Sequence, residues 1–345
     1  MNLSTSNSEP PRARVRPFRR YVKHTLGFLA VGLAVVAGPN VIVDPTGVFG
    51  FALPLPGHEA LHPHRSALHQ RPYKAEMLGH RSWDVLLVGS SRVVLGLDPA
   101  HPRFAGRRAL NVGIAGTSMQ EMKLVFDRIL ENQKPELVIW MADEFFFNRY
   151  RRLSPWVSSS RFDPDLDPWT YYGTLAFGKD TINFTLETLG NARAGRPSLA
   201  SDLGFRSRPK QQENWNYVQR LTRPVLTPGH RLHVRESSVA FSLQRLAEFV
   251  EICRRCQERG IELKVVTAPL HALVMARLRQ DSFSPAFFGK VKRACVGAID
   301  RLNAAAPQRP AIEFWDFHGH GKALTYALPQ DREQAEQARP YHWDP

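Results

Sequence analysis

The sequence is poor in cysteine and in acidic residues, and no internal repeat is evident in it. Only 3 of its 345 residues are cysteines, which excludes a disulfide-stabilised scaffold. It also lacks zinc-finger spacing, a basic zipper, a Walker A sequence and a G-x-G-x-x-G loop. The first two absences count against a nucleic-acid partner, and the last two count against a nucleotide-binding domain. Nothing in the sequence implies a metal or an organic cofactor.

Apolar residues and basic residues, in contrast, are abundant. Hydrophobic residues make up 43% of the chain and charged residues 23%, a balance that excludes a disordered protein. Lysine and arginine number 46 against 32 aspartates and glutamates, so the formal net charge is +14. This excess favours an anionic partner, such as an anionic lipid or an acidic polysaccharide, although a GC-rich genome would also enrich the chain in arginine.

The N-terminal segment has the pattern of a membrane anchor. Residues 1–24 form a basic tail, and residues 25–43 form an apolar run whose last 18 residues would span about 27 Å as a helix. That length is close to the ~30 Å hydrocarbon core of a bilayer. Because six cations precede the run against one glutamate, we expect a cytoplasmic N-terminus, a bacterial inner-membrane location and a periplasmic main domain.

Two alternatives to an anchor stay open, a cleaved signal peptide and a buried helix of a soluble protein. The apolar run is longer than a usual signal-peptide core of ~7–15 residues, and no A-x-A cleavage site follows it. We therefore expect an uncleaved signal anchor that crosses the membrane once.

Residues 44–80 are expected to form a linker or loop. Four histidines occur in it at irregular spacing, and no cysteine or paired carboxylate completes a metal site. A solvated loop over residues 57–71 is therefore expected. The four are His58, His62, His64 and His69.

Residues 81–345 have the pattern of one α/β domain. Apolar runs predict strands near residues 84–88, 109–116, 137–141, 261–267 and 312–316. Helices are predicted near residues 118–132, 242–257 and 283–304, the first with Ser118 and Glu121 at capping-box spacing. This alternation predicts a parallel sheet of the flavodoxin-like, three-layer type.

An aromatic-rich insertion interrupts this pattern at about residues 149–235. It shows no clear period apart from a helix predicted near residues 180–190. We expect it to cap the sheet and shape a substrate cleft; the alternative is a loop-rich structural excursion. Its acidic stretch Asp163-Pro164-Asp165-Leu166-Asp167 lacks the glycine and closing glutamate of an EF-hand and predicts a surface turn.

The most informative motif is Gly89-Ser90-Ser91-Arg92, directly after the first predicted strand. In an open parallel sheet, ligands bind beyond the carboxyl ends of the strands. A serine there can present its hydroxyl to a reacting centre, but the same turn also suits a helix N-cap or a phosphate cradle.

The wider order of motifs resembles the SGNH (GDSL-type) hydrolase superfamily, and more narrowly its membrane-anchored bacterial members. The resemblance rests on Val-Asp-Pro after the anchor, the Gly-Ser-Ser-Arg turn, the stretch Asn111-x-Gly113-x-x-Gly116 and the final Trp-Asp-Pro. It covers roughly residues 40–148 and 240–345. That superfamily includes periplasmic polysaccharide O-acetyltransferases and acetylesterases.

The resemblance implies a role for each matching residue. Ser91 would be the nucleophile, and the N–H groups of Ser91 and Gly116 would form the oxyanion hole. The usual Gly-x-Asn block after the third strand is missing. Asp143 would substitute for it only if protonated, and Asn148 lies further along.

The last block of the superfamily, Asp-x-x-His, begins at Asp344, which would orient a histidine acting as general base. That histidine would be residue 347, beyond the sequence given, so we expect either a fragment or a chain without it. His342 is the nearest substitute. Further candidates, with exposed loop histidines as the alternative, are His271, His318 and His320.

The pair Cys253 and Cys256 has C-x-x-C spacing but falls inside a predicted helix, which favours two buried thiols over a redox or metal site.

Three functions follow from these patterns. The first is acyl (O-acetyl) transfer or hydrolysis on a cell-envelope glycan, with an anionic glycan as substrate and, by resemblance, a membrane protein as acyl donor. The second is a non-catalytic, membrane-tethered scaffold or accessory protein of envelope polysaccharide assembly. The third, weaker one is a phosphate- or nucleotide-binding domain that uses residues 89–92 as an anion cradle.

Overall fold

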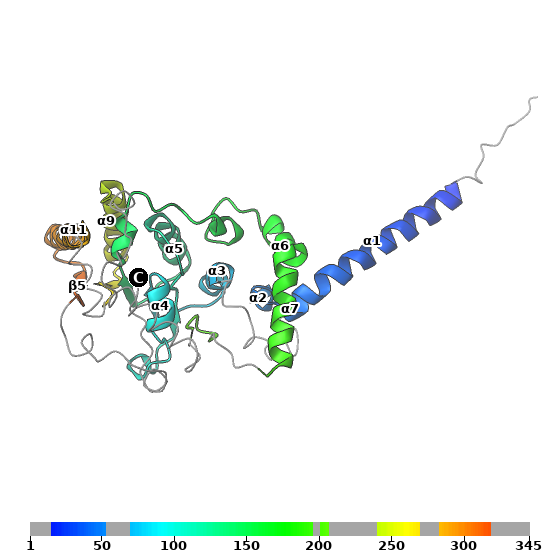
Figure 1. The fold of residues 1–345 in the computed structure, drawn as a ribbon, viewed down its shortest axis with the longest axis horizontal. Helices are drawn as coiled ribbons and strands as arrows, with labels where there is room; N and C mark the ends of the chain where they lie inside the picture. Colours follow the sequence, from blue (N-terminus) through cyan, green and yellow to red (C-terminus); the bar gives the residue numbers. More distant parts are fainter. Residues whose placement is uncertain (1–14, 53–69, 196–200, 207–239, 270–282, 319–345) are drawn as a thin grey trace, which may run out of the picture.

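The structure, a computed structural model, describes residues 15–52, 70–195, 201–206, 240–269 and 283–318. Its centre is a five-stranded, all-parallel sheet in the order β2-β1-β3-β4-β5, the order of flavodoxin-like sheets (Figure 1). The predicted strands are confirmed, although the second ends at Asn111 rather than 116. The strands are β1 (Val85–Val88), β2 (Ala109–Asn111), β3 (Leu137–Met141), β4 (Glu262–Val266) and β5 (Glu313–Trp315).

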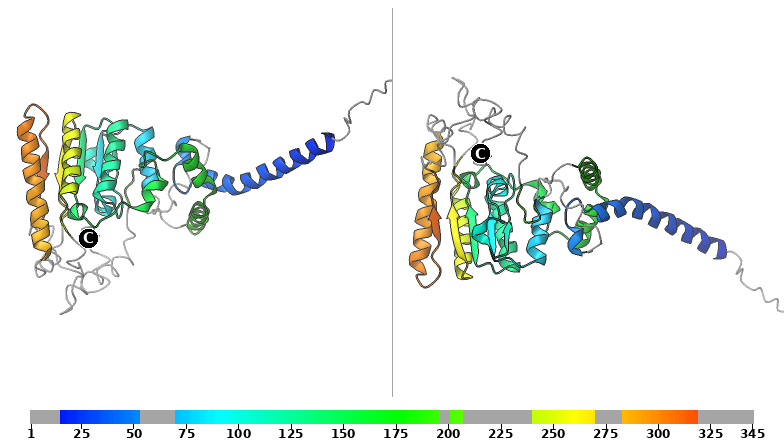
Figure 2. Two further views of the ribbon diagram at one scale, coloured as in Figure 1. Left: turned by 90° about the horizontal axis from the view of Figure 1, so that it is seen from above. Right: turned by 90° about the horizontal axis from the view of Figure 1, so that it is seen from below.

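The helices described cover the two faces of this sheet unequally. One face carries four neighbouring helices, of which α5, α9 and α11 are seen side by side in Figure 2. In the described part of the chain, the other face carries α4 (Ser91–Gly96), with Leu97 and Phe104 packed beside it. The four helices are α3 (Gln70–His80), α5 (Met119–Asn132), α9 (Leu243–Glu258) and α11 (Phe283–Ala305). Short 3-10 turns are η2 (Pro102–Phe104), η3 (Glu144–Phe147) and η4 (Pro155–Ser159).

Aromatic rings fill the core between the sheet and these helices. Trp140 of β3 is fully buried, with ring centroids 4.8 Å from Phe126 of α5 and 5.1 Å from Phe249 of α9. Cys253 and Cys256 are buried in the same core, and burial raises the pKa of Cys256 to about 12. The prediction of two buried thiols is confirmed.

The expected linker at residues 44–80 differs from the structure, because its end forms helix α3. Met77 and Leu78 of α3 lie in the core, and Lys74 and Glu76 are buried with them. These two charged residues break the apolar periodicity, which is why the helix was not evident from the sequence. Most of the histidine-rich segment lies outside the described residues.

The N-terminal helix α1 runs over Val15–Val43, so it begins ten residues before the apolar run. Arginine and lysine are good helix formers, and Pro17 falls in the first turn, where proline is tolerated. Its segment Phe18–Val43, of 26 residues, is long and apolar enough to cross a membrane.

A buried aspartate ends α1 and turns the chain. Asp44 has a φ of 45°, and its carboxylate accepts the N–H groups of Val48 at 2.8 Å and Gly50 at 2.9 Å. The chain then forms the short helix α2 (Phe49–Ala52). The Asp-Pro-Thr-Gly sequence therefore serves as a compact, hydrogen-bonded turn at the end of α1.

The insertion leaves and rejoins the sheet domain at one point. Asn148 pairs with Phe241 in an isolated antiparallel bridge, and the Asn148 side-chain oxygen accepts the N–H of Ala240 at 3.1 Å. Within the insertion, α6 (Pro168–Phe177) and α7 (Lys179–Arg193) are helical, which confirms the helix predicted near 180–190. The predicted surface turn is also present: Asp163 accepts from the N–H of Asp165, and Asp167 caps α6.

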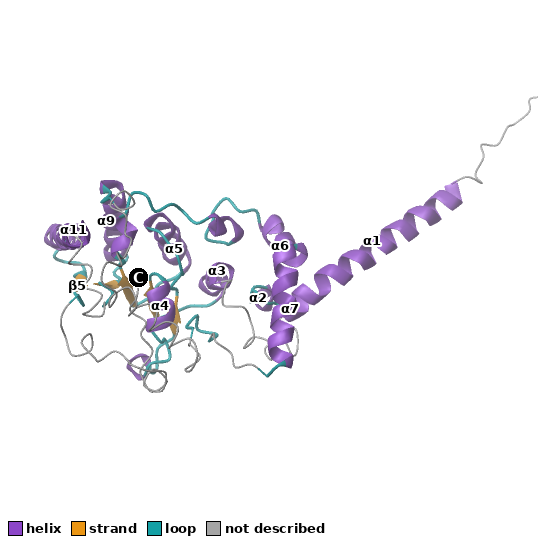
Figure 3. Ribbon diagram, in the orientation of Figure 1, coloured by secondary structure: helices purple, strands orange, loops and turns teal. Residues whose placement is uncertain are grey.

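The described helices of the insertion pack on α1, which differs from the expected cap over the sheet. Figure 3 shows α6 and α7 beside the base of α1, away from the strands. A separate piece, residues 201–206, does cover the outer edge of β2: the N–H of Asn111 donates to the Leu203 carbonyl at 2.9 Å.

Candidate functional site

The turn after β1 requires a glycine at its first position. Gly89 has a φ of 154°, and a Cβ there would lie 2.6 Å from a Val93 methyl carbon and 2.9 Å from the Met141 carbonyl oxygen. The chain can therefore pass directly from β1 into α4 beside the end of β3.

The two serines of this turn have different environments. Ser90 is buried; its hydroxyl donates to Asp143 Oδ2 at 2.8 Å and accepts the N–H of Arg92 at 3.3 Å as the N-cap of α4. Ser91 is the first residue of α4, and its side chain is partly exposed. Ser90 thus fixes the turn, and Ser91 is the serine of the pair that solvent reaches.

Four charged side chains form a connected, mostly buried network at this carboxyl edge of the sheet. The Arg92 guanidinium lies 3.4 Å from Asp143 Oδ1 and 3.7 Å from Glu144 Oε2. The other oxygen of Glu144, Oε1, lies 2.7 Å from His318 Nε2. Arg92 follows β1, Asp143 and Glu144 follow β3, and His318 follows β5, so three strand ends contribute to the network.

The network favours the charged form of His318. Burial alone would lower the pKa of His318, but the ion pair with Glu144 and the charge of Asp316 outweigh it, and the pKa is raised. Asp316 is itself fixed: it accepts from the Thr267 hydroxyl at 3.1 Å and from the His318 N–H at 3.0 Å. The neighbouring carboxylates therefore stabilise the imidazolium form of this histidine.

The loop after β2 lies beside the turn after β1. The N–H of Ile114 donates to the Gly89 carbonyl at 2.8 Å, which ties the two loops together. Asn111 supports the same region, because its amide donates to the Val93 carbonyl at 2.6 Å and its side-chain oxygen accepts the Gly113 N–H at 2.9 Å. Gly116, further along this loop, is exposed with a φ of 71°.

Other sequence-predicted site residues are placed as follows. Both oxygens of Asp143 accept, from Ser90 and Arg92, so the geometry does not suit it as an oxyanion donor. Asn148 closes the neck of the insertion instead of reaching the turn after β1. Asp344, His342, His271 and His320 lie outside the described residues.

Sequence reasoning missed Lys74, a buried lysine under the same loops. Its ammonium donates to the Gly113 carbonyl and, at 3.4 Å, to Asn111 Oδ1. Burial lowers its pKa to about 7. A single lysine carries no sequence signal of such burial, since the contacts come from residues far away in the chain. Glu144 and His318 were missed as partners for the same reason.

No protein-family model matches this chain, and no curated protein is significantly similar to it. What the fold and the site define is therefore a class by geometry alone: an α/β domain with a parallel sheet and a serine-bearing turn at its carboxyl edge.

Proposed function

We propose that this chain is a membrane-anchored acyl esterase or acyltransferase, acting on O-acetyl groups of a cell-envelope glycan, with Ser91 as nucleophile. The observation that carries the proposal is the contrast between the two serines. Ser90 is bound to Asp143, whereas Ser91 is partly exposed at the carboxyl edge, where parallel sheets bind ligands.

The proposed reaction has two steps. Ser91 Oγ attacks the ester carbonyl carbon and gives its proton to a base, and the glycan alkoxide leaves as the alcohol by taking that proton. In the second step, a water or a second glycan hydroxyl gives its proton to the base and attacks the acyl-serine carbonyl. The bond to Ser91 Oγ breaks, the serine takes that proton back, and the acyl group leaves as the free acid or as the new ester. By the resemblance, the base would be a histidine oriented by Asp344, with His342 as the nearest substitute.

The membrane location is part of the same proposal. Helix α1 is long and apolar enough to cross a bilayer, and the cations before it favour a cytoplasmic N-terminus and a periplasmic domain. An envelope glycan, and a membrane protein that donates the acyl group, would be within reach of a domain held there.

A second function, the non-catalytic scaffold, is favoured by one observation. The charged groups of the network are paired with one another, Arg92 with Asp143 and Glu144, and Glu144 with His318. An anion cradle at residues 89–92 has less support, because the Arg92 guanidinium is buried on two carboxylates.

The test is covalent labelling of the full chain, in membranes, with a fluorophosphonate probe. We expect wild type and Ser158→Ala to be labelled, since Ser158 is an exposed serine far along the chain, and Ser91→Ala to lose the label. Circular dichroism checks that each variant is folded. Absence of label on folded wild-type protein would overturn the catalytic proposal and favour the scaffold.

A further inference from the structure

Helix α7 buries threonines and exposes aliphatic side chains, the reverse of the usual arrangement in water. Thr181, Thr185 and Thr188 are buried against the rest of the chain. Ile182, Leu186 and Leu189, at the spacing of one helical stripe, are exposed to 37%, 64% and 41%. An exposed apolar stripe of this kind marks a surface that contacts a membrane or another protein.

Helices α6 and α1, which contact α7, also expose apolar side chains. Helix α6 contains no charged residue, and it exposes Trp169 to 86% and Phe177 to 45%. On α1, Val35 and Ile42 are exposed as well. Tryptophan at the edge of an apolar surface is typical of the boundary between lipid and water.

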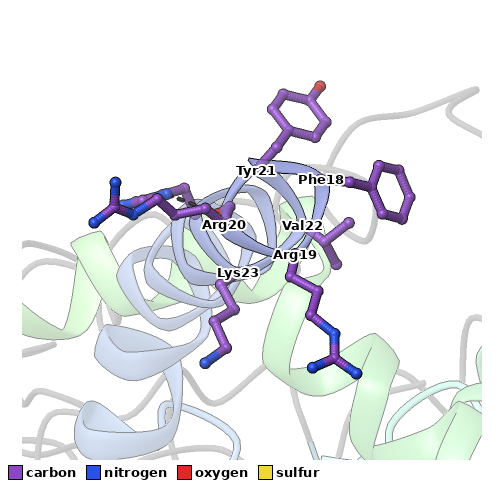
Figure 4. A pocket seen from close by; sticks show the side chains of 7 residues that line it. Phe18, Arg19, Arg20, Tyr21, Val22 and Lys23 are labelled. Carbon is purple, nitrogen blue, oxygen red and sulfur yellow. Dashed lines mark hydrogen bonds between the residues drawn. The ribbon is translucent and has the colours of Figure 1, made fainter. Parts of the chain in front are cut away.

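The length of α1 determines where its contact with α7 would lie relative to a lipid bilayer. The last lysine or arginine before the apolar stretch is Lys23, and the 20 residues from His24 to Val43 would span about 30 Å. Figure 4 shows Arg19 and Lys23 pointing away from Phe18 and Tyr21 at this end of the helix, an arrangement suited to a membrane surface. A bilayer that begins near Lys23 therefore ends near Val43.

Helix α7 is fixed to α1 at that far end. Asn40 donates to the Ala176 carbonyl of α6 at 2.8 Å and accepts from the Thr185 hydroxyl of α7 at 2.7 Å. Figure 1 shows α7 running across the base of α1 rather than along it. A helix that crosses the end of a membrane span lies close to the plane of the membrane.

We propose that α6 and α7 rest on the outer surface of the lipid bilayer, with the stripe Ile182, Leu186 and Leu189 inserted among the lipids. The inference rests on the proposed membrane anchoring of α1. Asn183 and Glu187, exposed on another side of α7, face water, and Lys179 and Arg193 near its two ends suit anionic headgroups. The domain is then held at a fixed orientation to the membrane, at two places rather than one.

The test uses single labels on the full chain in vesicles of phosphatidylcholine and phosphatidylglycerol. The native cysteines are buried, so a polarity-sensitive maleimide dye can be attached to Leu186→Cys, to its matched control Glu187→Cys, or to Val35→Cys in α1. Quenching is measured with nitroxide-labelled lipids and with aqueous iodide.

We expect the Leu186→Cys dye to be quenched several-fold more by nitroxide lipid than the Glu187→Cys dye, and several-fold less by iodide. Equal iodide quenching at both positions, with Val35→Cys quenched by lipid, would overturn this inference and leave the anchor intact. Iodide access at Val35→Cys would overturn the anchor itself. Protection of Leu186→Cys from both quenchers, with bismaleimide cross-linking between two chains, would assign the stripe to a second copy and overturn the lipid contact.

Discussion

The carboxyl edge of the sheet and the base of α1 bury polar groups of different kinds. At the sheet edge these groups are charged and paired: Arg92, Asp143, Glu144 and His318. At the base of α1, the groups that join this helix to α6 and α7 are uncharged, Asn40 and Thr185. The buried carboxylate of Asp44 lies just beyond the end of α1 and accepts two backbone N–H groups. Burying a charge in lipid is costly even when it is paired, whereas a satisfied amide or hydroxyl is tolerated. This difference fits the proposed placement of the base of α1 at a lipid bilayer.

The largest loss of stability is expected from a substitution in the core beside the sheet. Trp140→Ala removes the ring that fills the space between Phe126 and Phe249, and such truncations cost about 3–5 kcal/mol. We expect a matching loss in the free energy of unfolding, measured by urea titration of the full chain in detergent. Val35→Ala, on the exposed part of α1, is the control and should change the free energy of unfolding little. An equal loss for both variants would contradict the prediction that the core beside the sheet contributes more to stability than the exposed part of α1.

An intermediate effect is expected at the base of α1. Asn40→Ala removes two hydrogen bonds and leaves the Ala176 carbonyl and the Thr185 hydroxyl without this partner, at a cost of about 1–3 kcal/mol. Combined with Thr185→Val in a double-mutant cycle, it should show coupling between the two sites, measured as thermal stability in lipid nanodiscs. Additive effects of the two variants would mean that α1 and α7 are not joined by this bond.

The smallest change in stability is expected at the pair of His318 and Glu144, where the contribution to the free energy of unfolding depends on pH. Because the pKa of His318 is raised in the folded chain, its charged form adds stability that is complete below the unfolded pKa of about 6.5. That stability is lost as the pH rises through the folded value. His318→Gln should therefore narrow the difference in unfolding free energy between pH 5.5 and pH 8.5, and Asn40→Ala should leave it unchanged. An identical pH profile for His318→Gln and wild type would show that the pair with Glu144 does not form in solution.

The sequence predicted elements whose signals are local. The five apolar runs became the five strands, and Ser118 caps α5 by accepting the Glu121 N–H at 3.3 Å. The capping box itself is only half formed, because the Glu121 carboxylate instead pairs with Arg71 of α3 at 2.6 Å. That partner lies 50 residues away, beyond the reach of a spacing rule.

The sequence predicted where the candidate site lies in the fold, but it did not predict the hydrogen bonds and ion pairs that its residues form. The turn after β1 follows from a strand, a glycine and two serines in sequence. Which serine is bound depends on Asp143, which the fold brings from the end of another strand. The orientation of α7 was unpredictable for a different reason: periodicity shows that a helix has two faces, but not which of them the rest of the chain covers.

The bridge between Asn148 and Phe241 brings the two ends of the insertion together. Since residues 148 and 241 are neighbours in space, a short hairpin could join them in place of the residues between. Such a replacement would remove residues 201–206, which cover the edge of β2, and also Val157 and Phe162, which are buried in the core of the sheet domain. The helices proposed to rest on the bilayer and the turn that carries Ser91 therefore belong to different segments of the chain, which share the core through Val157 and Phe162.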